Sequence, residues 1–256
     1  MSKISRNTSG GKSVSGGALA PRSGRGNTAQ TDAYWRGGSA GPNASGGFAA
    51  VASTGLGYNY LQFRSTGNLT VLEPGTFEFL VFGGGGGGRN GNGYNSFGPG
   101  GQKGGTGNLT IASLSAGIYV VTVGGGGNGA TSNTYYNETP GTMSYFHTFT
   151  TGGNQGTGGA LNPGGNSAAG EAGTQVNTFI GGASLLKAAG GGNAPSGVGG
   201  SGIGGNGSNG SPGSSTSAAA NTASGGGGSG GSGQPVLQGG NGGNGGSGIV
   251  YVRWLA

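Results

Sequence analysis

The sequence feature that most restricts the fold is a run of strand-forming residues that leads directly into six consecutive glycines. The run is TGNLTVLEPGTFEFLVFGGGGGG, residues Thr66–Gly88. A similar order recurs at Thr106–Gly127, TGNLTIASLSAGIYVVTVGGGG, and in reverse at Gly239–Trp254, where the glycines come first. Consecutive glycines have no side chains to bury, so these tracts cannot build an ordinary hydrophobic core. The chain therefore couples a β-strand to a glycine tract three times.

The composition excludes two common explanations for long glycine tracts. Glycine accounts for 73 of the 256 residues but proline for only 9, so the proline-rich Gly-X-Y repeat of collagen is absent. The formal net charge is only +6, too small for charge repulsion to keep the chain expanded as in a strongly charged disordered protein. We therefore expect a compact chain that is stabilised mainly by hydrogen bonds between backbones.

The glycine tracts fit a helix with three residues per turn, because glycine often recurs at every third position, as from Gly204 to Gly213. The polyproline-II helix has this period and no internal hydrogen bonds, but glycine versions can pack closely and bond to one another. Ordering a residue costs about 1–2 kcal/mol, and a hydrogen bond returns about 0.5–1.5 kcal/mol, so only a bundle of such helices can hold. The alternative is a flexible Gly/Ser linker. We favour the bundle because a C-terminal strand needs a partner.

Three segments have the alternating pattern of half-buried strands, at about 76–82, 118–123 and 249–254. Proline and glycine precede the first two and suit tight turns. The repeated order of turn, strand and glycine tract indicates an internal duplication. The predicted fold is mainly β plus irregular structure: a small β-sheet or sandwich with packed polyglycine-II helices and little or no α-helix.

We predict two domains, a basic Ser/Gly-rich N-terminal arm at 1–47 and a glycine-rich domain at 48–256. The arm holds six basic residues and one acid, and tails of this kind are often ordered by a partner. Nucleic acid is a disfavoured partner because aromatic residues are few. The docking candidates are Arg22, Arg25, Tyr34, Trp35 and Arg36.

Catalysis and cofactor binding find little support in the sequence. The single histidine, His147, lies far from the single aspartate, Asp32, so a catalytic triad is not expected. Cysteine is absent, which together with the lone histidine argues against a metal site. Of the four glutamates, Glu73 fits a turn and Glu78 the second face of a strand. We predict no enzyme activity, no cofactor and, without a long apolar segment, no membrane insertion.

The combination of LTVLEPGTFEFLVFGGGGGG, a second strand ending in TVGGGG and a terminal GGNGGSGIVYVRW resembles the glycine-rich domain of tailed-phage tail proteins. It is also similar to the distal adhesin of T-even-like long tail fibres, over residues 68–254. In those adhesins packed polyglycine-II helices carry loops that contact an outer-membrane receptor. The resemblance implies a bacteriophage virion protein of the tail or tail fibre, made in the host cytoplasm. Its partners would be other virion proteins and a bacterial cell-surface receptor. Residues 1–65 match no motif of the fibre-attachment section.

On this resemblance, binding residues are expected between the glycine tracts. The most aromatic stretch is Thr131–Thr151, and tyrosine-rich loops offer rigid contact area at low entropy cost. The receptor-binding candidates are Tyr135, Tyr136, Tyr145, Phe146, His147, Phe149, Tyr94 and Phe97. The alternation of Tyr145, His147 and Phe149 fits a further scaffold strand equally well.

The alternative function is a purely structural virion protein of the baseplate, a fibre joint or the capsid surface, with no receptor role. A third class is a free glycine-rich protein that binds ice or RNA. An ice-binding bundle should show glycine periodicity from end to end, without the basic arm and the strands, so this class fits less well.

Overall fold

The computed structural model describes residues 41–91, 97–105, 109–131, 137–146, 168–208, 215–230 and 240–256. The chain divides into two compact units, Met1–Gly41 and Pro42–Ala256, and the second is described here. It is mainly β, with three antiparallel sheets and no long helix, which confirms the predicted fold class. None of the helices among these residues is long and apolar enough to cross a membrane.

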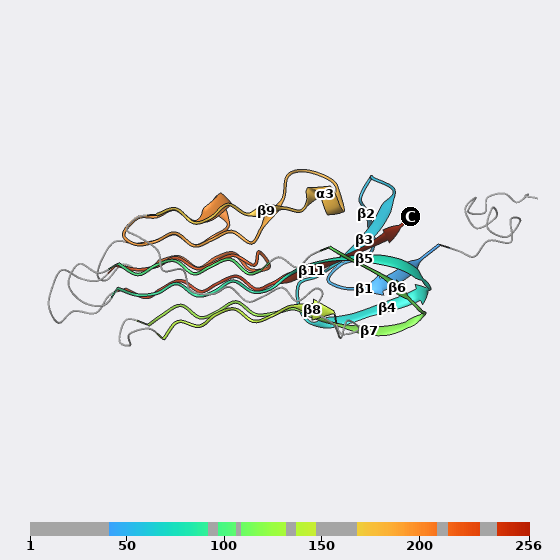
Figure 1. Cartoon of the computed structure of the whole chain (residues 1–256), viewed down its shortest axis with the longest axis horizontal. Coiled ribbons are helices and arrows are strands. Elements are labelled where there is room, and N and C mark those ends of the chain that lie inside the picture. Colours follow the sequence, from blue (N-terminus) through green and yellow to red (C-terminus); the bar gives the residue numbers. More distant parts are fainter. Residues whose placement is uncertain are drawn as a thin grey trace, which may run out of the picture. The chain divides into compact units, whose positions relative to one another are not determined.

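Two of the sheets form a sandwich (Figure 1). The first has the strand order β1 (Asn43–Gly46), β4 (Gly67–Glu73), β7 (Gly117–Thr122) and β8 (Tyr145–Phe146). The second has the order β2 (Ala52–Ser53), β3 (Tyr58–Phe63), β11 (Ile249–Leu255), β5 (Gly75–Phe82) and β6 (Thr110–Leu114). The third pairs β9 (Thr174–Gln175) with β10 (Leu186–Lys187); α3 (Asn177–Ile180) and a 3-10 turn at Gly200–Gly202 complete the list.

The strands expected at 76–82, 118–123 and 249–254 correspond to β5, β7 and β11. The duplicated units are strand–turn–strand elements that link the two sheets. The first unit contributes β4 to the four-stranded sheet and β5 to the five-stranded sheet. The second unit contributes β7 to the four-stranded sheet, where it pairs with β4, and β6 to the five-stranded sheet, where it pairs with β5. β1 lies inside the region 1–47 assigned to the arm, and the second compact unit begins at Pro42.

The core lies between these two sheets. In β5, the alternate residues Phe77, Phe79 and Val81 are fully buried, as their spacing predicts. β11 lies in the middle of its sheet and pairs with both β3 and β5, and its Trp254 ring lies 5.6 Å from that of Phe77. Burying an aliphatic or aromatic side chain of this size contributes about 1.5–3 kcal/mol. The sandwich is therefore the apolar part of a chain that is otherwise poor in apolar residues.

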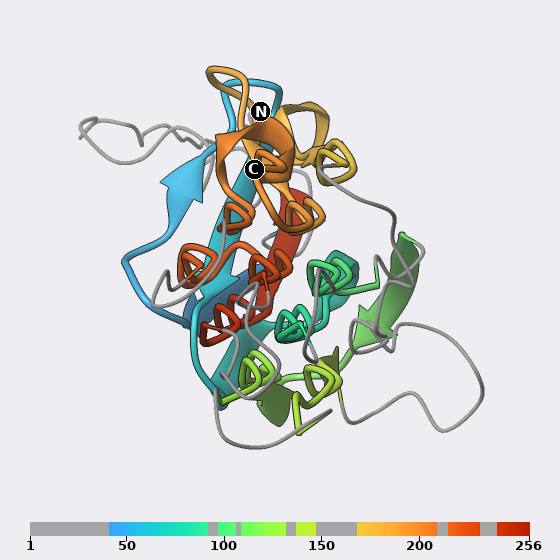
Figure 2. The same cartoon turned by 90° about the vertical axis from the view of Figure 1, so that its left-hand side faces the viewer.

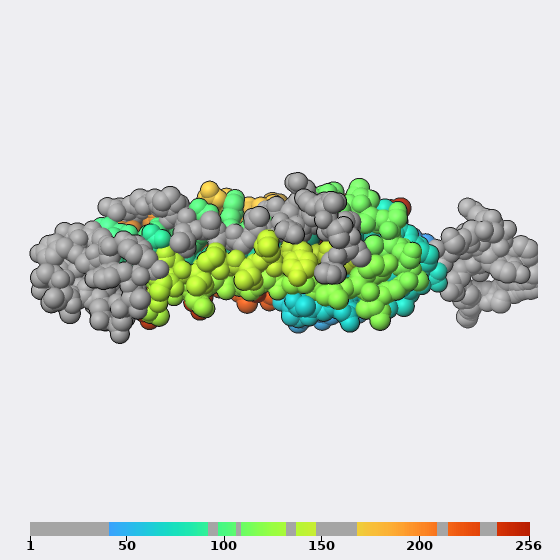
Figure 3. All heavy atoms as spheres, turned by 60° about the horizontal axis from the view of Figure 1, so that its bottom comes forward, coloured from blue at the N-terminus to red at the C-terminus, as the bar shows by residue number. Residues whose placement is uncertain are grey.

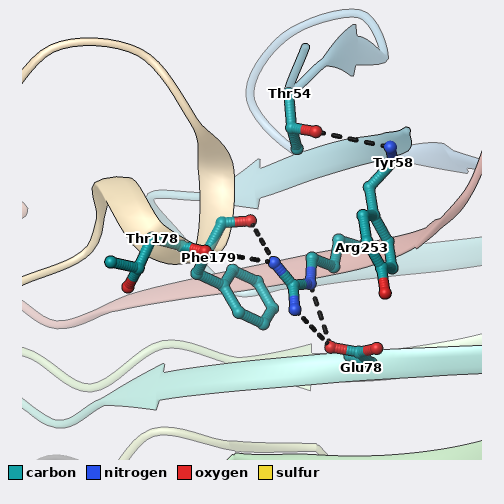
Figure 4. A network of polar contacts seen from close by, with 6 residues as sticks. All are labelled: Thr54, Tyr58, Glu78, Thr178, Phe179 and Arg253. Atoms are coloured by element: carbon teal, nitrogen blue, oxygen red, sulfur yellow. Dashed lines mark hydrogen bonds and ion pairs between the residues drawn. The ribbon is translucent and has the colours of Figure 1, made fainter. Parts of the chain in front are cut away.

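The outer face of the five-stranded sheet is covered by α3 and its neighbours, and Arg253 of β11 fixes that contact (Figure 4). Its Nε and Nη2 both donate to Oε2 of Glu78, at 2.9 and 2.7 Å, and its Nη1 donates to the carbonyl of Phe179 at 2.8 Å. The guanidinium lies 4.3 Å from the ring centre of Tyr58 and 4.2 Å from that of Phe179. One side chain thus joins β3, β5, β11 and α3.

The glycine tracts run side by side away from the sandwich (Figure 1). Seen end-on, each tract is a triangular coil, the shape of a helix with three residues per turn (Figure 2).

The hydrogen bonds of residues 83–89 show how the tracts pack. Successive N–H groups point to three different neighbouring tracts, and donors on one face are three residues apart. The acceptors are also three residues apart in reverse order, so these neighbours run antiparallel. The donor–acceptor pairs are Gly83–Gly105, Gly86–Gln102 and Arg89–Pro99 on one face, Gly84–Thr142 and Gly87–Thr139 on the second, and Gly85–Gly246 and Gly88–Gly243 on the third, all between 2.8 and 3.2 Å. This is the arrangement of packed polyglycine-II helices.

At the surface of the bundle, side chains accept the outward N–H groups of a glycine tract. Thr142 and Thr139 accept through their hydroxyls from Gly125 and Asn128, both at 2.8 Å, and the Asn137 amide oxygen accepts from Thr131 at 2.9 Å. Parts of the two tracts involved, 124–131 and 137–142, are exposed on the face seen in Figure 3, in yellow-green. The edge N–H groups are thus satisfied within the chain, as protein backbones require.

Candidate functional site

Where the glycine tracts end, away from the sandwich, the segments 92–96, 132–136, 209–214 and 231–239 interrupt the described chain. The residues that flank these segments, the loop stems, are bonded to one another. Backbone bridges join Phe97 to Gly230 and Ser208 to Ser229. The Asn90 side-chain amide donates to the Thr131 carbonyl at 2.9 Å, and the Gly240 N–H donates to the Gly230 carbonyl at 3.3 Å. Four connections far apart in sequence therefore start from one interlinked end of the bundle.

An ion pair lies among the loop stems. The Nε of Arg89 is 2.6 Å from Oε1 of Glu138, a side chain that is completely buried, whereas the Arg89 side chain is 27% exposed. Within the described residues, Oε2 of Glu138 has no hydrogen-bond partner. The pair connects a residue shortly before segment 92–96 with a residue shortly after segment 132–136. It therefore holds two loop stems at a fixed separation.

Replacing Glu138 with alanine should lower the free energy of unfolding by about 2–3 kcal/mol, because it leaves the partly buried Arg89 without its carboxylate. Glu138→Gln keeps an acceptor for Arg89 and should cost about 1 kcal/mol. Denaturant unfolding gives both values, and hydrogen exchange should become faster at Thr131. The control is Glu171→Ala, because the Lys103–Glu171 pair is exposed and its loss should be too small to measure. Equal stability of wild type and Glu138→Ala would show that the pair does not hold the stems.

The aromatic stretch Thr131–Thr151, treated above as one segment, is divided by the fold. Residues 137–142 form a tract that returns along the bundle, and Tyr145 and Phe146 then form β8 in the first sheet. Phe146 is 2% exposed and its ring stacks on that of Phe79 at 4.4 Å. Its position in the core takes Phe146 out of reach of a receptor. For these two residues the scaffold alternative describes the structure, with Tyr145 half-buried on the outer side.

Of the other candidates, only Phe97 lies within the described residues, half-buried at its bridge to Gly230. The remaining receptor-binding candidates lie outside the described residues: Tyr94, Tyr135, Tyr136, His147 and Phe149. The docking candidates do so as well: Arg22, Arg25, Tyr34, Trp35 and Arg36.

Sequence reasoning did not single out Arg89, Asn90 or Asn137, and it considered Glu138 only as one of the four glutamates in the search for catalytic residues. A usable signal was present for Arg89 and Asn90, because these polar side chains directly follow six consecutive glycines, whereas Asn137 and Glu138 have no glycine tract beside them in the sequence. The glutamates are distributed over separate partners: Glu78 binds Arg253, Glu138 binds Arg89 and Glu171 binds Lys103.

Comparison with protein families finds one that accounts for most of the chain. The model of a family described as a glycine-rich domain matches residues 64–255, from the end of β3 through the tracts to the end of β11. A comparison with curated proteins gave no significant match.

Proposed function

The chain belongs to the glycine-rich domain family, and from this premise we propose that it is a bacteriophage virion protein of the tail or tail fibre that binds a host receptor. In this proposal the receptor is a structure on the bacterial cell surface. The contacts are made by the segments that connect the glycine tracts at the loop stems. The protein acts in the virion, in contact with other virion proteins.

The observation that supports the proposal most is the interlinked set of loop stems. Recognition needs side chains, which the glycine tracts lack, so specificity has to come from the segments between them. A rigid scaffold that presents several connections at one end is the usual arrangement of binding loops. Tyr94, Tyr135 and Tyr136 fall within such segments, and tyrosine is well suited to contact surfaces. The Arg89–Glu138 pair and the Asn90–Thr131 bond brace two of these connections against each other.

The opposite end of the glycine-rich domain fits attachment to the particle. The chain enters the sandwich at β1 from the basic N-terminal region, which carries Arg22, Arg25 and Arg36 with the aromatic pair Tyr34 and Trp35. A partner with acidic and apolar surface would match this composition. In this proposal, residues 1–40 bind a virion protein while the loop stems face the host.

The test is adsorption of phage particles that carry the protein with Tyr135 and Tyr136 both replaced by serine. We expect a loss of adsorption of at least about tenfold, since truncating aromatic anchors typically removes about 2 kcal/mol or more of binding free energy. The matched control is Phe48→Ser, an aromatic residue that is 62% exposed on the sandwich. Deleting all of 131–151 would be uninformative because it removes a tract and β8.

Normal adsorption by the double variant, with normal incorporation into particles, would refute the receptor role and leave the purely structural virion protein. Absence of the protein from purified particles would refute both functions.

A further inference from the structure

Among the described asparagines of the glycine bundle that precede a glycine, Asn206, Asn241 and Asn244 share one feature: the N–H of the following glycine donates to a backbone carbonyl of another tract. We infer that they are latent deamidation sites, which the packed tracts keep unreactive and which become modified when the bundle opens. The inference concerns the chemistry of the backbone and does not depend on the proposed function.

The reaction needs no cofactor. The backbone nitrogen of the following glycine attacks Cγ of asparagine, a new C–N bond forms, the bond from Cγ to the amide nitrogen Nδ2 breaks, and ammonia leaves with the proton of the glycine N–H. Water then opens the succinimide ring to aspartate or isoaspartate. Glycine favours the attack because no side chain hinders its nitrogen and its backbone bends readily. In an unfolded chain, an asparagine that precedes glycine therefore deamidates faster than an asparagine that precedes any other residue.

In the bundle, the attacking nitrogens are all engaged. The N–H of Gly207 donates to the carbonyl of Gly197, that of Gly242 to Ala130, and that of Gly245 to Gly127, each at 2.8 Å. A nitrogen held in this way points to a neighbouring tract, not to the preceding side chain.

Two of the side-chain amides are also fixed. Oδ1 of Asn206 accepts from the Gly199 N–H at 2.7 Å, and Oδ1 of Asn244 accepts from the Gly129 N–H at 2.8 Å. Rotating either amide towards its own backbone would break a hydrogen bond between tracts. At these two sites, hydrogen bonds therefore hold both the attacking glycine nitrogen and the asparagine Cγ in positions where they cannot meet.

Burial does not provide this protection, because Asn206, Asn241 and Asn244 are all exposed. Water and base reach them freely, so the restraint has to be geometric. Each site then reacts only during the fraction of time in which its tract is open, and its rate reports the local opening equilibrium.

Once isoaspartate has formed, the tract cannot return to its packed state. Isoaspartate inserts an extra carbon into the backbone, which destroys the three-residue period on which the hydrogen bonds between tracts depend. Each event also adds one negative charge to a protein of net charge +6.

The experiment is incubation of the folded full-length protein at mildly alkaline pH, followed by peptide mapping with mass spectrometry. Synthetic peptides that span each Asn-Gly pair give the unprotected rates. We expect all three sites to react at least about 100-fold more slowly in the folded protein. Rates within about tenfold of the peptide rates would overturn the inference.

A second pair of variants separates local from global opening. A Cβ at Gly126 would lie closer than 3.0 Å to the carbonyl group of Gly245, whereas a Cβ at Gly125 meets only the Thr142 hydroxyl, at 3.9 Å. Gly126→Ala should therefore raise the deamidation rate at Asn244 by about tenfold or more relative to Gly125→Ala. Equal rates at Asn244 in two folded variants would contradict control by the tract.

Discussion

Replacing Gly85 with valine is expected to lower the free energy of unfolding by about 4 kcal/mol or more, which places it among the most severe point substitutions. Residues 83–89 pack against several other tracts, and a Cβ on Gly85 would lie closer than 3.0 Å to three backbone atoms of Ser224 and Gly225. A backbone cannot move aside as a flexible side chain does, so two tracts must separate and lose their hydrogen bonds. For a domain of this size the melting temperature should fall by about 10 °C or more.

The neighbouring residues Gly125 and Gly126 supply the matched comparison. Gly126→Ala introduces a Cβ into the backbone of the tract at 240–248 and should destabilise strongly, while Gly125→Ala adds the same methyl group in ordinary contact with Thr142. The Gly125 variant should stay within about 1 kcal/mol of wild type, because alanine also restricts the unfolded chain. Similar melting temperatures for both variants would argue against close packing of polyglycine helices.

Replacing Arg253 with alanine should lower the free energy of unfolding by about 3–5 kcal/mol, the usual cost of removing one partner of a buried ion pair. The side chains of Arg253 and Glu78 are 13% and 15% exposed, so Glu78 would be left with little water to replace the guanidinium. The Phe179 carbonyl would lose its donor, and the rings of Tyr58 and Phe179 would lose the cation between them. Denaturant unfolding followed by tryptophan fluorescence measures the change, since Trp254 is adjacent.

Two further variants show which part of the contact matters. Arg253→Lys keeps the charge but not the planar group that bonds and stacks at once, so it should recover only part of the loss. Arg253→Met combined with Glu78→Leu removes both charges and should cost less than Arg253→Ala alone. A double variant as unstable as the single one would show that packing of the Arg253 stem, and not the unpaired carboxylate, sets the cost.

The sequence predicted the parts of the fold that local pattern determines. The alternation in 76–82 and 249–254 identified β5 and β11, and the three-residue spacing of glycine identified the helical tracts. It did not predict β1 or β3, nor that β11 is inserted between β3 and β5. Such pairings depend on contacts between segments that are distant in sequence, and the local periodicity of apolar residues does not determine the order of strands in a sheet.

The candidate site was predicted less well, for a physical reason that residues 137–142 illustrate. Asn137, Thr139 and Thr142 lack the glycine density of a tract, yet their side chains accept hydrogen bonds that a glycine neighbour would accept through its carbonyls. A polar segment can therefore belong to the bundle when it lies at the edge. The hydrogen bonds of these threonine side chains leave no periodic signal in the sequence, so the sequence alone does not divide the stretch 131–151.

The central position of β11 determines when the sandwich can close. Arg253 and Glu78 are 175 residues apart in sequence, and every glycine tract is synthesised between β5 and β11. Until β11 arrives, β3 and β5 have unpaired edges, the feature that most readily leads strands to aggregate. The intervening tracts have few apolar side chains to add to that hazard. The residues that are synthesised between β5 and β11 therefore have a low tendency to aggregate while the sandwich is still incomplete.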